Sequence, residues 1–479
     1  MHLKTLSITL LALLSLAHTH GETEKQLAFP TAEGYGKYTV GGRGGKVYAV
    51  TNLNDSGEAS LRAAIEAEGP RTVVFRVSGT IVLESDLRIS NPYLTVAGQT
   101  APGDGITLRR HPLLIDADEV IIRYIRVRLG DEAGDFPDAI TSRYTKNLIL
   151  DHVSASWSID ETMTIYHGEH TTVQWCIISE SLYESNHAKG NHGFGGIWGS
   201  NYSSYHHNLI ASHSNRSPRF ASGSGNVDYR NNVVYNWGYA STYGAENVQQ
   251  SNREKFNFSN INMVANYYKP GPATLPGAIS HQLAAPWSRN GDSDYGKWYI
   301  ADNVMVGSEA VTSDNWKGVV PSLTAINGVQ KHNPNNLSAI PSLKLLAPWP
   351  AMPIRQQTAE EAYLSVLAEA GAKVPSRDSV DLRIIDEVKN GYATYKGLTY
   401  ENDHELAAPS QMHGIIDSQN DVGGWPVLQS LPAPVDSDSD GMPDAWENAH
   451  GLDPLNPSDG NQIGPGGYTQ LEIYLNSII

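Results

Sequence analysis

The stretch that decides the fold spans Asn147 to Phe220 and reads NLILDHVSASWSIDETMTIYHGEHTTVQWCIISESLYESNHAKGNHGFGGIWGSNYSSYHHNLIASHSNRSPRF. Short β-branched runs alternate in it with segments that are rich in Asn, His, Gly and Asp. Buried strands of this length, with polar residues gathered at their turns, indicate stacked coils with a binding groove along one face.

Strands of the same kind recur outside this stretch. Apolar runs with Asn, Asp or His at one edge return at intervals of roughly 25 to 30 residues, with one longer gap. They occupy 119–127, 147–155, 172–179, 205–212, 227–235, 256–264 and 297–306. A propeller needs several strands per repeat and a sandwich favours two-residue hairpin turns, neither of which the runs show. The repeat therefore predicts an all-β chain folded as a parallel β-helix.

Two further patterns support stacked coils. Asn recurs near the edges of the strands, and we interpret nearly all of these residues as structural, in turns or in side-chain ladders. They are Asn208, Asn231, Asn232, Asn236, Asn262, Asn266 and Asn303. The segment EASLRAAIEAEG (58–69) has Leu61 and Ile65 on one helical face. A helix followed at once by strands is suited to capping the first coil.

The chain divides into four parts on composition. An apolar run from Leu6 to Ala17 predicts a signal peptide over 1–21, too short to span a membrane, and hence a secreted protein. Residues 26–428 make the β-helical domain, in which the helical patterns at 359–372 and 381–391 wrap over the last coils. The Pro-rich segment 429–435 reads as a linker, and 436–479 form a compact second unit.

The charge of the chain limits its partners. The 479 residues carry a formal net charge of −17, which argues against nucleic acid and against an anionic membrane surface. An acidic substrate remains possible where a bridging cation or a local basic cluster meets it. The one cysteine, Cys176, lies in the apolar run VQWCII, so no intramolecular disulfide forms and the thiol is expected to be buried. We expect a monomer.

The second unit begins with the spacing of an EF-hand-type calcium loop. Oxygen donors fall at positions 1, 3, 5, 9 and 12 of DSDSDGMPDAWE, and Gly441 supplies the sharp turn at position 6. A solvated acidic linker would explain the charge but not this register. The tail resembles calcium-binding modules at the C-termini of secreted bacterial polysaccharide-degrading enzymes, with a structural calcium ion. The predicted calcium-loop positions are Asp436, Asp438, Asp440, Met442, Asp444 and Glu447.

A second set of charged residues falls on successive coils of the β-helix. Carboxylates can hold Ca²⁺, and a cation placed on the carboxylate of a uronic acid stabilises the enediolate that forms when the α proton is removed. Nearby lysine and arginine would hold the substrate. Residues about one coil apart lie side by side if the turns align. The members of this set are Asp138, Asp160, Glu161, Lys189, Arg216 and Arg219.

Two other polar groups are open to a catalytic interpretation. Asp151 and His152 are adjacent, but neighbours on a strand point to opposite faces, so we predict that they stabilise a turn and do not cooperate directly. Histidines such as His187 and His192 match no common zinc spacing. We expect them to line the groove or to form hydrogen-bond ladders.

Taken in order, six pieces resemble the pectate lyases of polysaccharide lyase family 1. These pieces are VIIRYIRVR, DAI, LILDHVS, IDETMTI, NHAK and NRSPR, and the resemblance covers roughly residues 28 to 305; together with the tail it suggests the secreted bacterial type. It implies a right-handed parallel β-helix and Ca²⁺-dependent cleavage of polygalacturonate by β-elimination to unsaturated oligogalacturonides. It also implies that Asp138 and Asp160 are calcium ligands, that Lys189 binds a substrate carboxylate, and that Arg216 is the catalytic base.

The chain departs from the family pattern at two positions. Thr164 stands where the family often has a second carboxylate, so either Glu161 compensates or calcium binds only with substrate present. Ala221 stands where the family has a further arginine, so Arg219 either takes part in substrate binding or is structural.

Three alternatives remain at this point. The alternatives to a pectate lyase are a lyase for another uronate polymer, a β-helical glycoside hydrolase and a non-enzymatic glycan-binding adhesin. The hydrolase would use Asp138 and Asp160 as its carboxylate pair. The product separates the enzymes, because elimination leaves an unsaturated uronide that absorbs ultraviolet light and hydrolysis does not.

Overall fold

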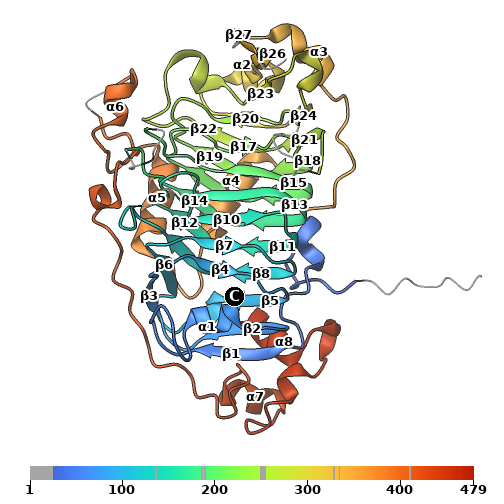
Figure 1. The fold of residues 1–479 in the computed structure, drawn as a ribbon, viewed down its shortest axis with the longest axis vertical. Coiled ribbons are helices and arrows are strands. Elements are labelled where there is room, and N and C mark those ends of the chain that lie inside the picture. Colours follow the sequence, from blue (N-terminus) through green and yellow to red (C-terminus); the bar gives the residue numbers. More distant parts are fainter. Residues whose placement is uncertain are drawn as a thin grey trace, which may run out of the picture.

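The computed structural model describes residues 25–134, 137–184, 187, 190–248, 255–326, 329–333, 335–408 and 411–479. The expected signal peptide at 1–21 lies outside these residues. The described chain forms the right-handed parallel β-helix that the sequence predicts, with stacked coils that each contribute to three parallel sheets (Figure 1).

Two of the three sheets adjoin, because the long strands β13 (Met163–Gln174) and β15 (Ile197–His206) run through both. Besides the first halves of these two strands, the first sheet contains β4 (Leu87–Ile89), β7 (Leu113–Ile115), β10 (Ile140–Arg143), β17 (Arg219–Phe220), β20 (Thr242–Gly244), β23 (Ala284–Ser288) and β26 (Ser322–Ile326). Besides their second halves, the second sheet contains β1 (Lys46–Val50), β2 (Arg71–Phe75), β5 (Leu94–Ala97), β8 (Val120–Arg123), β11 (Lys146–Asp151), β18 (Gly225–Arg230), β21 (Ser259–Val264) and β24 (Lys297–Ala301).

The third sheet is separate and consists of one short strand from each coil. It contains β3 (Gly79–Val82), β6 (Ile106–Arg109), β9 (Arg126–Arg128), β12 (Ser154–Ser156), β14 (Ile177–Ser179), β16 (Leu209–Ala211), β19 (Val233–Tyr235), β22 (Tyr267–Lys269) and β25 (Val304–Met305). The chain therefore passes from the second sheet to the third and then back to the first in every coil.

The hydrophobic core runs along the axis of the stack. Strand residues alternate inward and outward, so parallel pairing in register places apolar side chains directly above one another. One such row passes through the second sheet, and all of its members are buried. It contains Val73, Val96, Ile122, Leu150, Val173, Tyr205, Tyr229, Met263 and Ile300. From Ile122 onward these are apolar positions of the repeating runs in the sequence.

The turn from the second sheet to the third is the same in seven coils. Its first residue has a left-handed backbone with φ between 50° and 58° at Tyr124, His152, Trp175, His207, Asn231, Ala265 and Asp302. In the later coils the next residue is asparagine, and these side chains form a ladder. Asn232 Oδ1 accepts from the backbone N of Asn208 at 3.0 Å, and Asn266 Oδ1 accepts from the backbone N of Asn232 at 2.9 Å. The structural role expected for these asparagines is confirmed.

Cys176 occupies the asparagine position in the coil before the ladder. Its thiol is fully buried in the core, as expected, and its backbone N donates to Asn208 Oδ1 at 2.9 Å. The ladder therefore begins at Cys176 and continues through Asn303, whose backbone N donates to Asn315 Oδ1.

Both ends of the stack are covered. The short helix α1 (Leu61–Glu66), which begins at its N-cap Ser60, packs Leu61, Ala64 and Ile65 into the core and is the cap that the sequence predicts. The other end is covered by α2 (Glu309–Ser313), α3 (Ile340–Leu343) and the antiparallel pair of β26 with β27 (Val329–Asn333).

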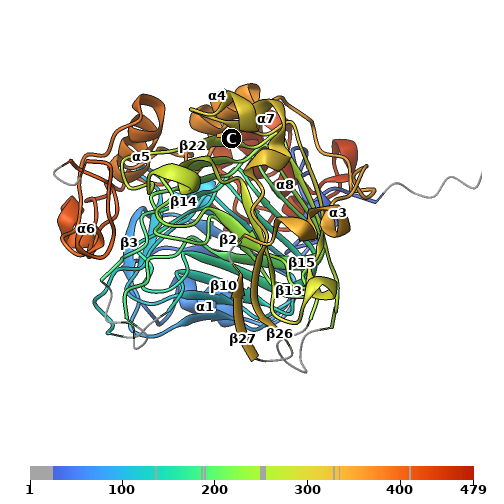
Figure 2. The same cartoon turned by 90° about the horizontal axis from the view of Figure 1, so that it is seen from above.

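The helices α4 (Ala359–Glu369) and α5 (Ser379–Asn390) cover the outer face of the third sheet, and α6 (Tyr400–Asp403) lies beyond them (Figure 2). Val366 and Ile384 pack against Ile177, Leu209 and other outward side chains of β14, β16 and β19. The two helices are therefore present, but the expectation that they wrap over the last coils was wrong, because their apolar faces pack on strands of the middle coils.

The C-terminal unit contains α7 (Asp444–His450) and α8 (Gln470–Ser477), which lie beside the first coils (Figure 1). The segment 429–435, which we expected to be a linker, runs along those coils. Leu431 N donates to Pro102 O at 3.1 Å, and Arg76 donates to Pro434 O at 2.7 Å. Among the described residues, no helix is both long enough and apolar enough to cross a lipid bilayer.

We predict that Asn232→Ala destabilises the protein by about 1 to 3 kcal/mol, because it leaves the buried backbone N of Asn208 without its acceptor. The measurement is chemical denaturation of the two proteins. Asn260→Ala is the matched control, because Asn260 is partly exposed and its side chain donates one bond, to Asn226 Oδ1. Equal stability losses in the two variants would contradict a special role for the ladder.

Candidate functional site

The predicted groove residues come from connections between the third sheet and the first. Asp138 precedes β10, Asp160 and Glu161 precede β13, and Arg216 precedes β17. His187 and His192 lie in the connection before β15. These are four successive coils, and their register places the connections next to one another.

Three carboxylates meet in this groove. One oxygen from each of Asp138, Asp160 and Glu161 lies within 4.8 Å of the other two. Asp138 is held in place by the Thr141 hydroxyl, which donates to Oδ2 at 2.8 Å, and by Glu161 N, which donates to Oδ1 at 3.2 Å. Burial raises the pKa of Asp138, and burial together with the nearby Asp138 charge raises the pKa of Asp160. Thr164 is buried beside Asp138 and supplies no carboxylate.

Arg216 is the counter-ion of this cluster. Its guanidinium forms an ion pair with Glu161 and lies 3.9 Å from Asp160 Oδ1. Its carbon Cζ sits 4.2 Å from the centre of the Phe194 ring, which covers one side of the group. The Arg216 backbone is left-handed, with φ of 59°, and its N donates to Asn215 Oδ1 at 2.6 Å. The structure thus brings Asp138, Asp160, Glu161 and Arg216 together.

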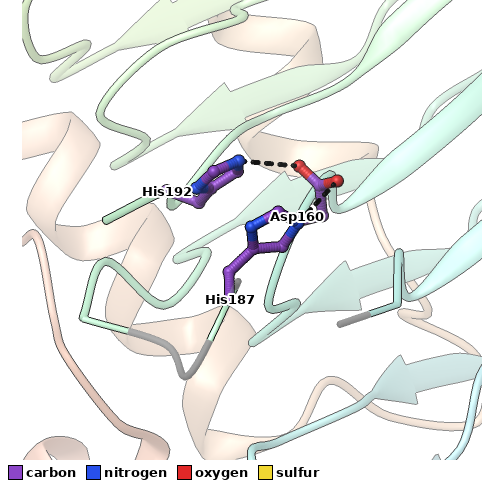
Figure 3. Close-up of side chains that lie close together, drawn as sticks. All are labelled: Asp160, His187 and His192. Carbon is purple, nitrogen blue, oxygen red and sulfur yellow. Dashed lines mark ion pairs between the residues drawn. The ribbon is translucent and has the colours of Figure 1, made fainter. Parts of the chain in front are cut away.

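Two histidines also approach Asp160 (Figure 3). His187 Nε2 lies 3.5 Å from Asp160 Oδ2, and His192 Nε2 lies 3.8 Å from Asp160 Oδ1. The two imidazole rings stack with centres 3.7 Å apart. Both rings adjoin the carboxylate cluster, and their shared contact with Asp160 had no recognisable spacing in the sequence.

The remaining predicted groove residues lie elsewhere. Lys189 falls outside the described residues. Arg219 pairs with Glu246 at 3.2 Å, and Arg289 contacts the same carboxylate at 2.9 Å. Burial of Arg219 opposes its charge, but Glu246 outweighs this effect and raises the pKa of Arg219. Ala221 is fully buried under the sheet.

The contact between Asp151 and His152 contradicts the expectation that their side chains point to opposite faces. They are in direct contact, with His152 Nδ1 2.8 Å from Asp151 Oδ1. The expectation of opposite faces was wrong because His152 has a left-handed backbone, with φ of 54°, which breaks the strand alternation. Asp151 also accepts from Arg123 and Gln174, at 2.7 and 2.8 Å. Burial opposes its charge, but His152 and Arg123 hold the pKa of Asp151 well below its usual range.

The groove carboxylates fit a calcium ion. Calcium takes oxygen ligands at 2.3 to 2.6 Å, so two ligands of one ion lie at most about 5 Å apart, and the three carboxylates meet that limit. A second group, Asp160 with His187 and His192, also has its donor atoms within 4.8 Å of one another. Its imidazole nitrogens suit a transition metal better than calcium. Both groups share Asp160.

The C-terminal loop brings together most of its predicted ligands and adds one more. Asp436, Asp438 and Asp440 form one group, and Asp440, Glu447 and Asp459 form a second. Asp459 lies well beyond the predicted loop, so the loop spacing gave no sign of it. Asp444 points elsewhere, because its oxygens accept from the backbone N and the hydroxyl of Ser437, each at 2.7 Å.

The acidic groups of this loop lie close together and repel one another electrostatically. Burial and the charges of Asp438 and Asp436 raise the pKa of Asp440 to about 7. Burial and the charges of Asp440 and Asp438 likewise raise the pKa of Glu447 to about 7. Met442 contributes no side-chain ligand: it is fully buried, and its N donates to Asp440 Oδ1 at 2.9 Å. A divalent cation would offset part of the negative charge of this cluster, whose donors are oxygens suited to calcium.

Comparison with known proteins gives three findings. No protein-family model matches the chain. A probable pectate lyase C of Emericella nidulans is 36% identical over 476 residues, covering 98% of this chain and 96% of that protein. A probable pectate lyase C of Aspergillus flavus is 35% identical over 483 residues, covering 99% and 98%. The crystal structure of Jun a 1, the major allergen from cedar pollen, matches with a TM-score of 0.50 at 16% identity, covering 71% of this chain and 92% of that one, and this likeness concerns the fold.

These relatives are fungal, so they do not support the bacterial type that the tail suggested. Because the matches cover 98% or more of the chain, they also include most of the C-terminal unit.

We predict that Arg216→Ala tightens Ca²⁺ binding in the groove by about tenfold, equivalent to about 1.4 kcal/mol, because Arg216 competes for Asp160 and Glu161. Asp160→Asn should weaken binding, since it removes the carboxylate common to both ligand groups. The measurement is calorimetric titration in a Glu447→Gln background, which disables the tail loop. Arg88→Ala, which removes an exposed arginine from β4, is the control. Unchanged or weaker binding by Arg216→Ala would contradict the competition.

Proposed function

Because this chain belongs to the pectate lyase family and is a polysaccharide lyase, we propose that it cleaves polygalacturonate by Ca²⁺-dependent β-elimination. The observation that carries the proposal is the meeting of Asp138, Asp160 and Glu161 with Arg216 in one groove. A site that cleaves an anionic polymer by elimination needs a bound cation and a cationic side chain. The three carboxylates can bind the cation, and Arg216 is the cationic side chain.

The proposed reaction needs one proton acceptor. Arg216, in its neutral guanidine form, takes the proton α to the uronate carboxyl, and the electron pair of that C–H bond forms a carbon–carbon double bond. To reach this form the guanidinium gives one proton to water and leaves its ion pair with Glu161. The bond to the neighbouring sugar oxygen breaks, and this oxygen leaves with its electron pair and takes up a proton from water. The products are unsaturated oligogalacturonides. Phe194 covers the Arg216 guanidinium and limits its contact with water.

Asp138, Asp160 and Glu161 are the proposed calcium ligands of the groove. Calcium held there would supply Lewis-acid chemistry that stabilises the negative charge formed when the α proton is removed. The second proposed calcium ion is structural and lies in the tail loop. Its ligands come from Asp436, Asp438, Asp440 and Glu447.

Lys189 and Arg219 are the proposed substrate-binding cations. Arg219 is the weaker candidate, because Glu246 already neutralises it and little of its side chain is exposed. We propose that the chain is secreted, on the apolar run from Leu6 to Ala17, and that it acts as a monomer.

The alternatives have less support. A glycoside hydrolase separates its two carboxyl groups by about 5 to 9.5 Å. Oxygens of Asp138 and Asp160 lie within 4.8 Å of each other, which suits a shared cation better than a sugar and a water between them. A glycan-binding adhesin does not agree with membership of an enzyme family. A lyase for another uronate polymer stays the second candidate, since the groove chemistry is the same.

We predict that Arg216→Ala lowers the turnover of polygalacturonate by about 10² to 10⁴, the usual contribution of a general base. The assay follows the ultraviolet absorbance of the unsaturated product with Ca²⁺ present, on a panel of uronate polymers. Equilibrium binding of polygalacturonate to the variant should persist. Arg88→Ala again controls for the loss of one positive charge. A turnover close to that of the unaltered protein would remove Arg216 from the role of base.

A further inference from the structure

The C-terminal unit covers an apolar surface on the outside of the first coils. Val74 of β2 and Ala97 of β5 point away from the core of the stack and are nevertheless buried. They pack against Met442, Leu471 and Leu475, with Val47 and Ala49 of β1 at the edge of the same cluster. Without the C-terminal unit, this patch of the second sheet would face water.

Polar contacts join the same two surfaces. Asp436 Oδ2 pairs with Arg76, the residue after β2, at 3.1 Å. Glu472 of α8 pairs with Arg43 at 2.7 Å. Arg123 of β8 donates to Asn476 Oδ1 at 3.0 Å. Most of the length of the unit, from its first acidic residue to its last helix, is therefore attached to the β-helix.

The acidic loop holds buried oxygens that point at one another. Glu447 is fully buried, and neither of its carboxylate oxygens has a hydrogen-bond partner within the described part of the chain. The same holds for Asp440 Oδ2 and Asp459 Oδ1. Gly460 lets the second loop approach, because a Cβ there would lie 2.6 Å from Asp440 Oδ2. Buried anionic oxygens without partners are costly unless a cation is bound to them.

Two residues connect this cation pocket to the β-helix. Asp436 belongs to the ligand group and also pairs with Arg76. Met442 lies between the ligands Asp440 and Glu447 in sequence and inserts its side chain between the outer face of β2 and α8. The Met442 backbone N also donates to Asp440 Oδ1, so the position of Met442 is coupled to that of a ligand carboxylate.

We propose that a divalent cation bound by Asp436, Asp438, Asp440, Glu447 and Asp459 fastens the C-terminal unit to β1, β2 and β5, so that cation loading in the tail stabilises the first coils of the β-helix. This inference rests on the structural calcium ion of the proposed function. It adds Asp459 as a ligand, leaves Asp444 out, and assigns the ion the role of a clasp.

The first part of the test is cation binding to the full-length protein. Terbium luminescence, excited through tryptophan, reports binding in an Asp160→Asn background that disables the groove. We expect the signal to be lost in Glu447→Gln and in Asp459→Asn. Asp444→Asn is the matched control from the same loop and should keep the signal, because Asp444 bonds to Ser437.

The second part is hydrogen exchange in the same proteins. We expect amides of β1, β2 and β5 to exchange only after the clasp has opened. Free Ca²⁺ at 100 times its Kd should then slow their exchange about a hundredfold, because bound Ca²⁺ keeps the clasp closed. Exchange in β21 and β24, far along the stack, should not change. Met442→Ala keeps every carboxylate but removes the buried contact, so it should bind terbium while losing the Ca²⁺-dependent protection of β1, β2 and β5.

The possible results distinguish a failure of the clasp from a failure of the tail calcium site or of the proposed lyase activity. Terbium binding without added protection in β1, β2 and β5 would overturn the clasp and leave the structural calcium site standing. Loss of binding in Asp444→Asn with binding kept in Asp459→Asn would overturn the ligand set. No tail signal at all would overturn both the clasp and the tail calcium site, whereas turnover of polygalacturonate would be judged by its own assay.

Discussion

The site depends on the register of the coils, which the turn between the second and third sheets fixes. One left-handed residue per coil turns the chain at the same place from Tyr124 to Asp302, and from Cys176 onward the asparagine ladder also bonds each turn to the next. A parallel stack without such a turn could slip by a residue, and every side chain would then change face. Because the register holds, residues that are about one coil apart in sequence meet at the groove, even though their own connections differ in length.

The groove and the tail face the same electrostatic problem, which is to collect carboxylates in a chain that is already strongly acidic. In the groove the counter-charge is internal, because Arg216 pairs with Glu161 and approaches Asp160. Among the described residues, Arg76 is the one cation that pairs with the tail cluster, and it contacts Asp436 alone among the acidic ligands. The tail therefore depends more strongly on an outside cation than the groove does.

The sequence predicted the fold wherever the pattern was periodic. The apolar runs gave the strands, and the face formed by Leu61 and Ile65 gave the cap. Spacing and family resemblance together indicated Asp138, Asp160, Glu161 and Arg216. The predictions failed where the backbone is irregular or where contacting residues lie far apart in the sequence. The left-handed turn at His152 brings its side chain to Asp151. Asp459 joins the acidic loop in space although it follows the end of that loop in the sequence. Arg219 and Glu246 are 27 residues apart, and no local pattern in the sequence pairs them.

The packing of the C-terminal unit explains why a β-helix with its own caps also carries an acidic tail. The cap α1 closes the end of the stack but leaves the outer faces of β1, β2 and β5 uncovered, and these faces carry Val47, Val74 and Ala97. An exposed apolar strand surface at the edge of a sheet favours association with other chains. Burying that surface under residues 436–479 removes the hazard, and the similarity to fungal relatives extends over most of this unit. The tail is thus better regarded as a part of the β-helical fold than as an appended module.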